Sequence, residues 1–146
     1  MMENLQLTLE LLPCELSVCR VSSLKDIDLG KSFFFLSRTD EEISLVCRTE
    51  DCPEHTVRRD DGWRGFRIQG VLAFSMVGVL ARLAAILAEN QISIFAVSTY
   101  NTDYFLVKRE DYDRSVSVLQ ESGYTILWGK SVPHAMSSTD CLHHFE

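Results

Sequence analysis

The sequence has few of the residues that interrupt folded structure: only 7 glycines and 3 prolines among 146 residues. Hydrophobic residues make up 46% of it. This composition argues against disorder over most of the length, because the chain has enough apolar side chains to bury a core. The length suits one domain or two very small ones.

Clustered positive charge is also lacking. The formal net charge is -7, and the pair Arg58-Arg59 is followed at once by Asp60-Asp61. Because binding to phosphates needs clustered lysines and arginines, we expect no nucleic-acid partner.

Long hydrophobic runs are absent too, since no run approaches the roughly 20 residues that a membrane helix needs. The first 16 residues alternate between polar and apolar and have no basic region, so they do not resemble a signal peptide. The 5 cysteines lack the spacing of a disulfide framework, which favours free thiols in a reducing compartment. We therefore expect a cytoplasmic protein with no membrane partner.

The motifs of the common catalytic sites are missing. There is no glycine-rich phosphate loop, no nucleophile elbow and no metal-ligand pair on a helix, so we expect neither an enzyme nor a cofactor. The four-residue gaps of Cys14/Cys19 and Cys47/Cys52, with His55 nearby, leave a zinc site as an alternative. However, Cys19 and Cys47 fall in expected strands, where cysteine is typically a small buried hydrophobe, so no metal is expected.

The first part of the chain, residues 1–61, reads as a strand-rich unit with short helices. Its expected strands are Leu5–Leu11, Leu16–Val21, Phe33–Leu36 and Ile43–Cys47. Pro13 is expected to end the first of them, and Leu24–Leu29 can form one helical turn. Thr39 and Glu42 have the spacing of a capping box, which predicts another turn of helix. The polar stretch 49–61 reads as a linker.

The second part, residues 62–129, reads as strand, helix, strand, strand, helix, strand. The expected strands are Trp63–Ile68, Ile92–Thr99, Asp103–Lys108 and Tyr124–Trp128; the expected helices are Met76–Asn90 and one from Glu110 to a glycine cap at Gly123. This order is the ferredoxin-like plan of an α+β fold, with an antiparallel sheet and helices on one face. Residues 130–146 have no periodicity and are expected to be a flexible tail.

Two segments of the second part resemble ACT domains, the small regulatory modules of amino-acid metabolism. Gly78-Val79-Leu80-Ala81 matches the family's helix start, although Val77 stands where the family usually has proline. The string from Ile94 to Asp103 is similar to that of small tandem ACT proteins. The resemblance implies two ACT-like units, 1–61 being degenerate and 62–129 complete, which bind a free amino acid without catalysis.

The start of the first long helix is one half of the expected ligand site. The residues are Phe74, Ser75, Met76, Val77 and Gly78. Gly78 lacks a Cβ, and the first N–H groups of a helix have no internal partner, so the carboxylate of an amino acid suits this place. The alternative is that Gly78 only permits tight packing and Ser75 is an ordinary helix cap. Spacing alone favours that alternative, and the resemblance favours the site.

The polar elbow between the two middle strands is the other half. It contains Thr99, Tyr100, Thr102 and Asp103. The Asp103 carboxylate can pair with an ammonium or guanidinium group. The resemblance supports this role, because Thr99, Tyr100 and Asp103 match pocket-lining positions in the arginine-sensing branch of the family. A plain turn closed by Asn101 and Asp103 is the alternative.

How the two halves meet depends on the sheet. We expect Ile92–Thr99 to run beside Trp63–Ile68, which brings the two halves together. In a ferredoxin-like sheet the elbow can instead fall at the opposite end, and the two halves then meet only between units or between chains. A small unit with an open sheet edge is expected to form a homodimer. The competing function is a dimerising structural subunit that binds no ligand.

Overall fold

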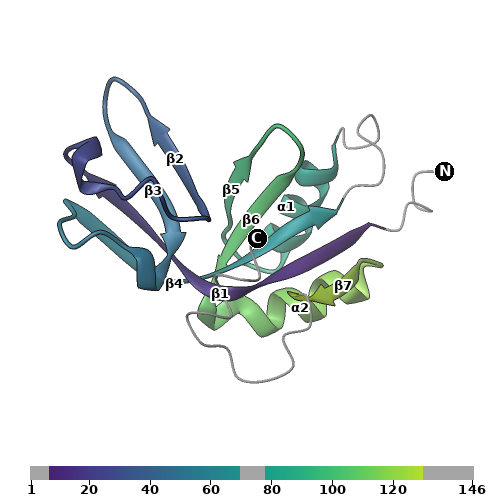
Figure 1. The fold of residues 1–146 in the computed structure, drawn as a ribbon. Coiled ribbons are helices and arrows are strands. Elements are labelled where there is room, and N and C mark those ends of the chain that lie inside the picture. The colour runs from purple at the N-terminus through teal and green to yellow at the C-terminus, as the bar shows by residue number, and fades with distance from the viewer. Residues whose placement is uncertain (1–6, 70–77, 130–146) are drawn as a thin grey trace. The chain divides into compact units, whose positions relative to one another are not determined.

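The structure is a computed structural model that describes residues 7–69 and 78–129 (Figure 1). Its contacts divide the described residues into two compact units. Unit 1 contains residues 7–12 and 64–129, and unit 2 contains residues 13–63. Residues 7–12 therefore belong with the second part of the chain rather than with the residues that follow them.

Unit 1 is a sheet with two helices. Its strands are β1 (Thr8–Val21), β4 (Arg58–Gln69), β5 (Phe95–Ser98), β6 (Asp103–Lys108) and β7 (Thr125–Trp128). Two of them, β1 and β4, also contribute to unit 2. Its helices are α1 (Val79–Glu89), the short η5 (Arg109–Asp111) and α2 (Tyr112–Glu121). The strand order is β7-β1-β4-β6-β5. The predicted ferredoxin-like order is therefore confirmed, with the start of β1 inserted beside β7, to which it is parallel. None of the described helices is long and apolar enough to cross a membrane.

Both helices bury one apolar stripe against the same face of the unit-1 sheet. Leu83 and Leu87 of α1 are fully buried, as their helical spacing predicts. They share a core with Phe66 of β4 and Phe105 of β6, whose rings stack with centroids 4.6 Å apart. Val116 and Leu119 of α2 complete it. This core fixes which face of β6 lies towards the helices, and so it positions the elbow.

Unit 2 is a smaller sheet without an α-helix in residues 13–63. Its own elements are η2 (Leu24–Asp26), β2 (Phe34–Arg38), β3 (Ile43–Arg48) and η3 (Thr49–Asp51). The strand order is β2-β3-β1-β4. Cys19, Val21, Ile27, Leu45 and Cys47 form its core. The single helical turn predicted near Leu24 is present, capped by Ser23.

The prediction that Pro13 ends a strand is wrong, because β1 continues through it to Val21. The pairing of β1 explains why proline is tolerated. Two strands pair in turn with the same edge of β1. The first, β7, pairs with β1 as far as Leu11, and the second, β3, pairs with it from Leu16 onwards. Pro13 lies in the gap between these two ladders, where its missing N–H leaves no hydrogen bond unmade on that side.

Two further expectations for residues 39–61 are corrected. Thr39 does accept hydrogen bonds from the backbone N–H groups of Glu41 and Glu42, at 3.1 and 3.2 Å. These bonds close a β-hairpin and not a helix, because β2 and β3 pair on both sides of the loop. The stretch 49–61 is not a linker throughout: it contains η3, and β4 begins at Arg58.

Candidate ligand-binding site

The elbow between β5 and β6 is a tight hairpin turn held by threonine. Ser98 and Asp103 are the last opposed pair of the two strands. The Thr99 hydroxyl donates to the carbonyl of Thr102 at 2.9 Å and accepts from its N–H at 3.3 Å. Thr99 therefore supplies the side-chain oxygen that closes the turn, a role that the plain-turn alternative gave to Asn101 and Asp103.

A second threonine ties the elbow to β4. The hydroxyl of Thr102 donates a hydrogen bond to the backbone carbonyl of Ile68, near the end of β4. The strand beside β4 is β6, so the expectation that Ile92–Thr99 runs there is wrong. The elbow nevertheless lies at the end of the sheet where the chain leaves β4, and α1 is the next described element (Figure 1). The two halves of the predicted site therefore belong to the same end of unit 1.

Asp103 lies on the helix-bearing face of the sheet. Side chains alternate along a strand, and Phe105 and Val107 of β6 both enter the core beneath α1 and α2. Asp103 shares their face, whereas Thr102 and Tyr104 face the other way. The Asp103 carboxylate is half-buried, and it forms no hydrogen bond or ion pair with the residues that the structure describes. Among the described residues it is thus an acceptor without a partner, at the end of the sheet where the chain leaves β4.

The first turn of α1 offers the opposite charge. Gly78 precedes the helix with φ 83°, and among the described residues no side chain caps the helix N-terminus. The first bond within the helix runs from the N–H of Arg82 to the Gly78 carbonyl, which leaves the N–H groups of Val79, Leu80 and Ala81 without helical partners. These groups carry partial positive charge. The predicted Phe74, Ser75, Met76 and Val77 lie outside the described residues.

The structure explains why position 78 is a glycine. A Cβ built on Gly78 meets no atom within 4 Å, so tight packing does not require glycine there. The backbone does require it, because an L side chain rarely adopts φ 83°. A substitution such as Gly78→Val, which adds a side chain where a ligand could approach, therefore also strains the backbone.

We predict that Gly78→Ala lowers the free energy of unfolding by about 1–2 kcal/mol, the cost of a left-handed conformation for an ordinary residue. Gly78→Asn should cost clearly less, because asparagine tolerates this conformation. Urea unfolding of the two variants measures the difference. Equal costs would show that space, and not backbone conformation, selects glycine at this position.

Tyr100 projects into solvent from the elbow. It is fully exposed, with a relative accessibility of 102%. Thr99 and Thr102 use their hydroxyls to hold the elbow. Among the predicted residues that the structure describes at the elbow, Asp103 is therefore the one with a free charged group.

Sequence patterns missed a buried carboxylate on the other face of the unit-1 sheet. Glu10 alternates with leucines, which predicts exposure, yet it is buried. It accepts hydrogen bonds from Arg67 Nε at 3.0 Å, from Arg67 Nη2 and from Gln69 Nε2 at 2.8 Å. Because these partners satisfy Glu10 on the face away from the helices, the group stabilises the sheet and is not part of the Asp103 site.

The cysteines of unit 2 form a buried cluster. Cys19, Cys47 and Cys52 are free thiols, and Cys14, against the expectation, is disulfide-bonded. Burial, with the neighbouring Cys52, raises the pKa of Cys19 to about 12 and the pKa of Cys47 above its ordinary value. Both thiols are therefore protonated at neutral pH. No group of three or more metal-ligating side chains in the described part of the chain could hold an ion.

The order of strands and helices in unit 1 is that of the class of ACT-type units. A family model for the ACT domain matches residues 58–121. The crystal structure of protein Atu0741 from Agrobacterium tumefaciens is 31% identical, with a TM-score of 0.77, and the match covers 89% of this chain and 98% of that one. The chain belongs to the ACT-domain family.

A human relative is the "Putative protein CASTOR3P", which is 32% identical over 108 residues. The match spans 66% of this chain and 66% of that protein. Two more distant structures share the fold. VC0802 from Vibrio cholerae is 23% identical, with a TM-score of 0.65, and the match covers 84% of this chain and 95% of that one. Aspartate kinase from Synechocystis is 14% identical, with a TM-score of 0.58, and the match covers 92% of this chain and 29% of that one.

Proposed function

We propose that this chain is a non-catalytic, cytoplasmic sensor module that binds a free amino acid through an ACT-like unit at residues 62–129, with a degenerate unit at residues 1–61. The observation that carries the proposal is the position of Asp103. Its carboxylate, which has no partner among the described residues, lies on the helix-bearing face of unit 1, at the end where the chain leaves β4.

An amino acid presents the complementary pair of charges. Its α-carboxylate is negative and suits the first N–H groups of α1, where the helix dipole favours an anion. Its ammonium group, or a cationic side chain, suits the carboxylate of Asp103. Phe74, Ser75, Met76, Val77 and Gly78 then contribute the helix side of the site, and Thr99, Tyr100, Thr102 and Asp103 the elbow side.

Each residue of the elbow has a distinct part in this proposal. The hydrogen bonds of Thr99 and Thr102 fix the turn against β4, so the Asp103 carboxylate is held in place before a ligand arrives. Such preorganisation reduces the entropy lost on binding. Tyr100 is exposed beside it and can cover one side of a bound ligand. Binding then stabilises one arrangement of the site over others, which is how a sensor reports its ligand.

The second candidate is a structural subunit that forms dimers and binds no ligand. The hydroxyls of Thr99 and Thr102 favour this candidate, because both already donate hydrogen bonds to backbone carbonyls, of Thr102 and of Ile68 in β4. Thermal-shift measurements with each of the twenty amino acids distinguish the candidates. A rise in melting temperature with one amino acid or a related few supports the sensor; no rise with any of them supports the structural subunit.

We predict that the chain is a homodimer. In unit 1, β5 and β7 each pair with one neighbour among the described strands, and β7 carries the exposed apolar residues Leu127 and Trp128. Unpaired edges with apolar side chains favour association with a second copy. Light scattering at micromolar concentration should give twice the mass of the chain, and a monomer there would contradict the prediction.

A further inference from the structure

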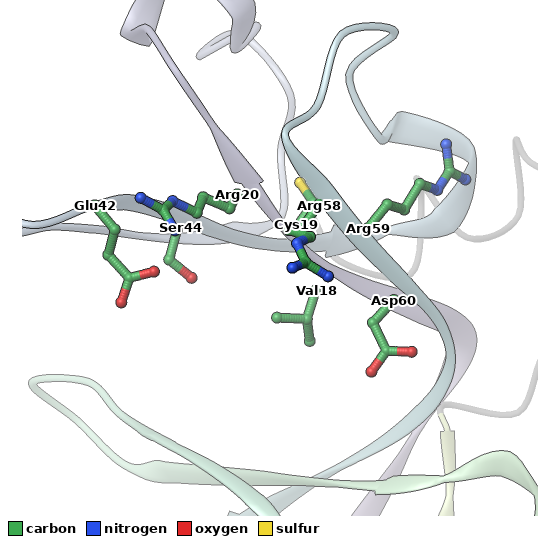
Figure 2. A pocket seen from close by; sticks show the side chains of 8 residues that line it. All are labelled: Val18, Cys19, Arg20, Glu42, Ser44, Arg58, Arg59 and Asp60. Atoms are coloured by element: carbon green, nitrogen blue, oxygen red, sulfur yellow. The ribbon is translucent and has the colours of Figure 1, made fainter.

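Unit 2 has a hollow of about 500 Å³ that contains none of the predicted site residues (Figure 2). Side chains from three strands line it, including Val18 and Arg20 of β1, Ser44 of β3 and Arg58 of β4; Glu42 lies just before β3. Its volume is within the range of small-ligand pockets, which is about 300–1,000 Å³.

The hollow lies on the face of the unit-2 sheet that is opposite the unit-2 core. On β1, Cys19 and Val21 enter the core, so Val18 and Arg20 face the other way. Arg20 and Ser44 are directly opposed in the pairing of β1 with β3, which places both on this face. The hollow is therefore built on a sheet, the kind of support that holds side chains with little freedom.

The charged groups at the hollow differ in what they already bind. Arg59 pairs with Asp61 at 2.8 Å, and its side chain points away from the hollow (Figure 2). The guanidinium of Arg58 lies over Val18 and makes no hydrogen bond or ion pair with a described residue. Arg20 donates to the Glu41 carbonyl at a long 3.4 Å. Arg58 is thus free to bind an anion, with Arg20 only weakly engaged.

Glu42 adds a carboxylate to the charged groups that line the hollow. The side chain of Glu42 has no partner among the residues that the structure describes. Figure 2 shows it at one side of the hollow, with the guanidinium of Arg58 in the middle and Ser44 between the two. Asp60, which shares this face with Arg58, is a second carboxylate of the lining and lies on the other side of the guanidinium (Figure 2). The hollow therefore offers the Arg58 cation between two carboxylates, with Val18 as an apolar part of its floor.

We propose that this hollow binds a second small zwitterion, one that carries both a carboxylate and an amine. Arg58 holds the carboxylate, because a guanidinium matches the two oxygens of a carboxylate and keeps its charge at every physiological pH. Glu42 holds the amine, and Ser44 offers a hydroxyl between them. The site shares no residue with the Asp103 site, so it stands or falls independently of the proposed function.

The test is a titration followed by NMR of the ¹⁵N-labelled chain. The probes are glycine, β-alanine and 4-aminobutyrate, which separate the two charges by increasing lengths, with acetate and ethylamine as probes of one charge each. We expect one of the zwitterions to shift the amide signals of Val18, Arg20 and Ser44 saturably, and to bind more tightly than both single-charge probes. Equal binding of acetate would overturn the assignment of a zwitterion, and unsaturable shifts with every probe would show only a solvated charged face.

Variants show which of the two proposed sites is responsible for the binding seen in the titration. Arg58→Gln should weaken the binding by about tenfold or more, the loss expected for a charge-assisted hydrogen bond. Arg59→Gln is the matched control and should leave it unchanged, because Arg59 is paired with Asp61. Asp103→Asn should also leave it unchanged. An effect of Asp103→Asn without an effect of Arg58→Gln would contradict this proposal and support the Asp103 site alone.

Discussion

Replacing Phe105 with alanine is expected to destabilise unit 1 by about 3–5 kcal/mol, the usual cost of removing a buried phenylalanine ring. Phe105 has 0% of its surface exposed, and its ring stacks on Phe66 with an interplanar angle of 4°. The side chain lies in the core beneath the two helices. The alanine variant therefore loses both the apolar area and the ring contact. Urea unfolding, followed by circular dichroism, measures the change.

Phe35→Ala is the control for this prediction. Phe35 is only half-buried, on β2, and it meets Phe33 edge to face with centroids 5.3 Å apart. A ring that keeps much of its contact with water contributes less, so we expect a cost of roughly 1–2 kcal/mol. If the two variants were equally stable, the unit-1 core would not be centred on the stacked rings.

Replacing Asp51 with alanine is expected to destabilise unit 2 by about 3–5 kcal/mol. The side chain of Arg48 is 1% exposed, and its Nε lies 2.9 Å from Asp51 Oδ2. Its Nη2 donates to the Ser32 hydroxyl at 3.2 Å. Without Asp51 the guanidinium stays buried but loses the carboxylate bonded to its Nε, and removing one partner of a buried ion pair is costly. The free energy of unfolding is again the measured quantity.

An exposed ion pair provides the matched control. Asp111 and Arg114 also stand three residues apart, at 3.4 Å, but the Arg114 side chain is 52% exposed. Exposed pairs of this kind contribute about 0–1 kcal/mol, so Asp111→Ala should be nearly neutral. A similar small effect for Asp51→Ala would mean that Arg48 does not depend on that carboxylate.

The sequence predicted unit 1 well because its pattern is local. Leu83 and Leu87 repeat at helical spacing, and Gly123 has φ 102° directly after α2, as a glycine cap requires. Such signals depend only on residues close in the chain. They also gave the order of elements that identifies the fold.

The errors concern pairings between distant residues. Whether Pro13 ends β1 depends on where β7 and β3 pair with it, and neither segment is near it in the sequence. The burial of Glu10 depends on Arg67 and Gln69, more than fifty residues further on. The bonds of Thr39 fit a helix cap and a hairpin equally well, and only the pairing of β2 with β3 decides between them.

The candidate site shows the same division. Sequence patterns and the family resemblance placed Asp103 at the elbow, but not on a face of the sheet. That face follows from the core positions of Phe105 and Val107. Similarly, the run Arg58-Arg59-Asp60-Asp61 looks self-cancelling in the sequence. In β4, alternate residues face opposite ways, so Arg59 pairs with Asp61, while Arg58 and Asp60 share the other face and both line the hollow.

Calorimetric titration of Asp103→Asn tests the central claim most directly, with the amino acid that most stabilises the native chain. The substitution keeps the shape of the side chain and removes its charge. We predict that binding weakens by about 1–3 kcal/mol, the range for charge-assisted hydrogen bonds. Asp113→Asn, on the exposed surface of α2, should leave the affinity unchanged. Unchanged affinity in Asp103→Asn as well would contradict the proposed site and place the amino acid elsewhere in the chain.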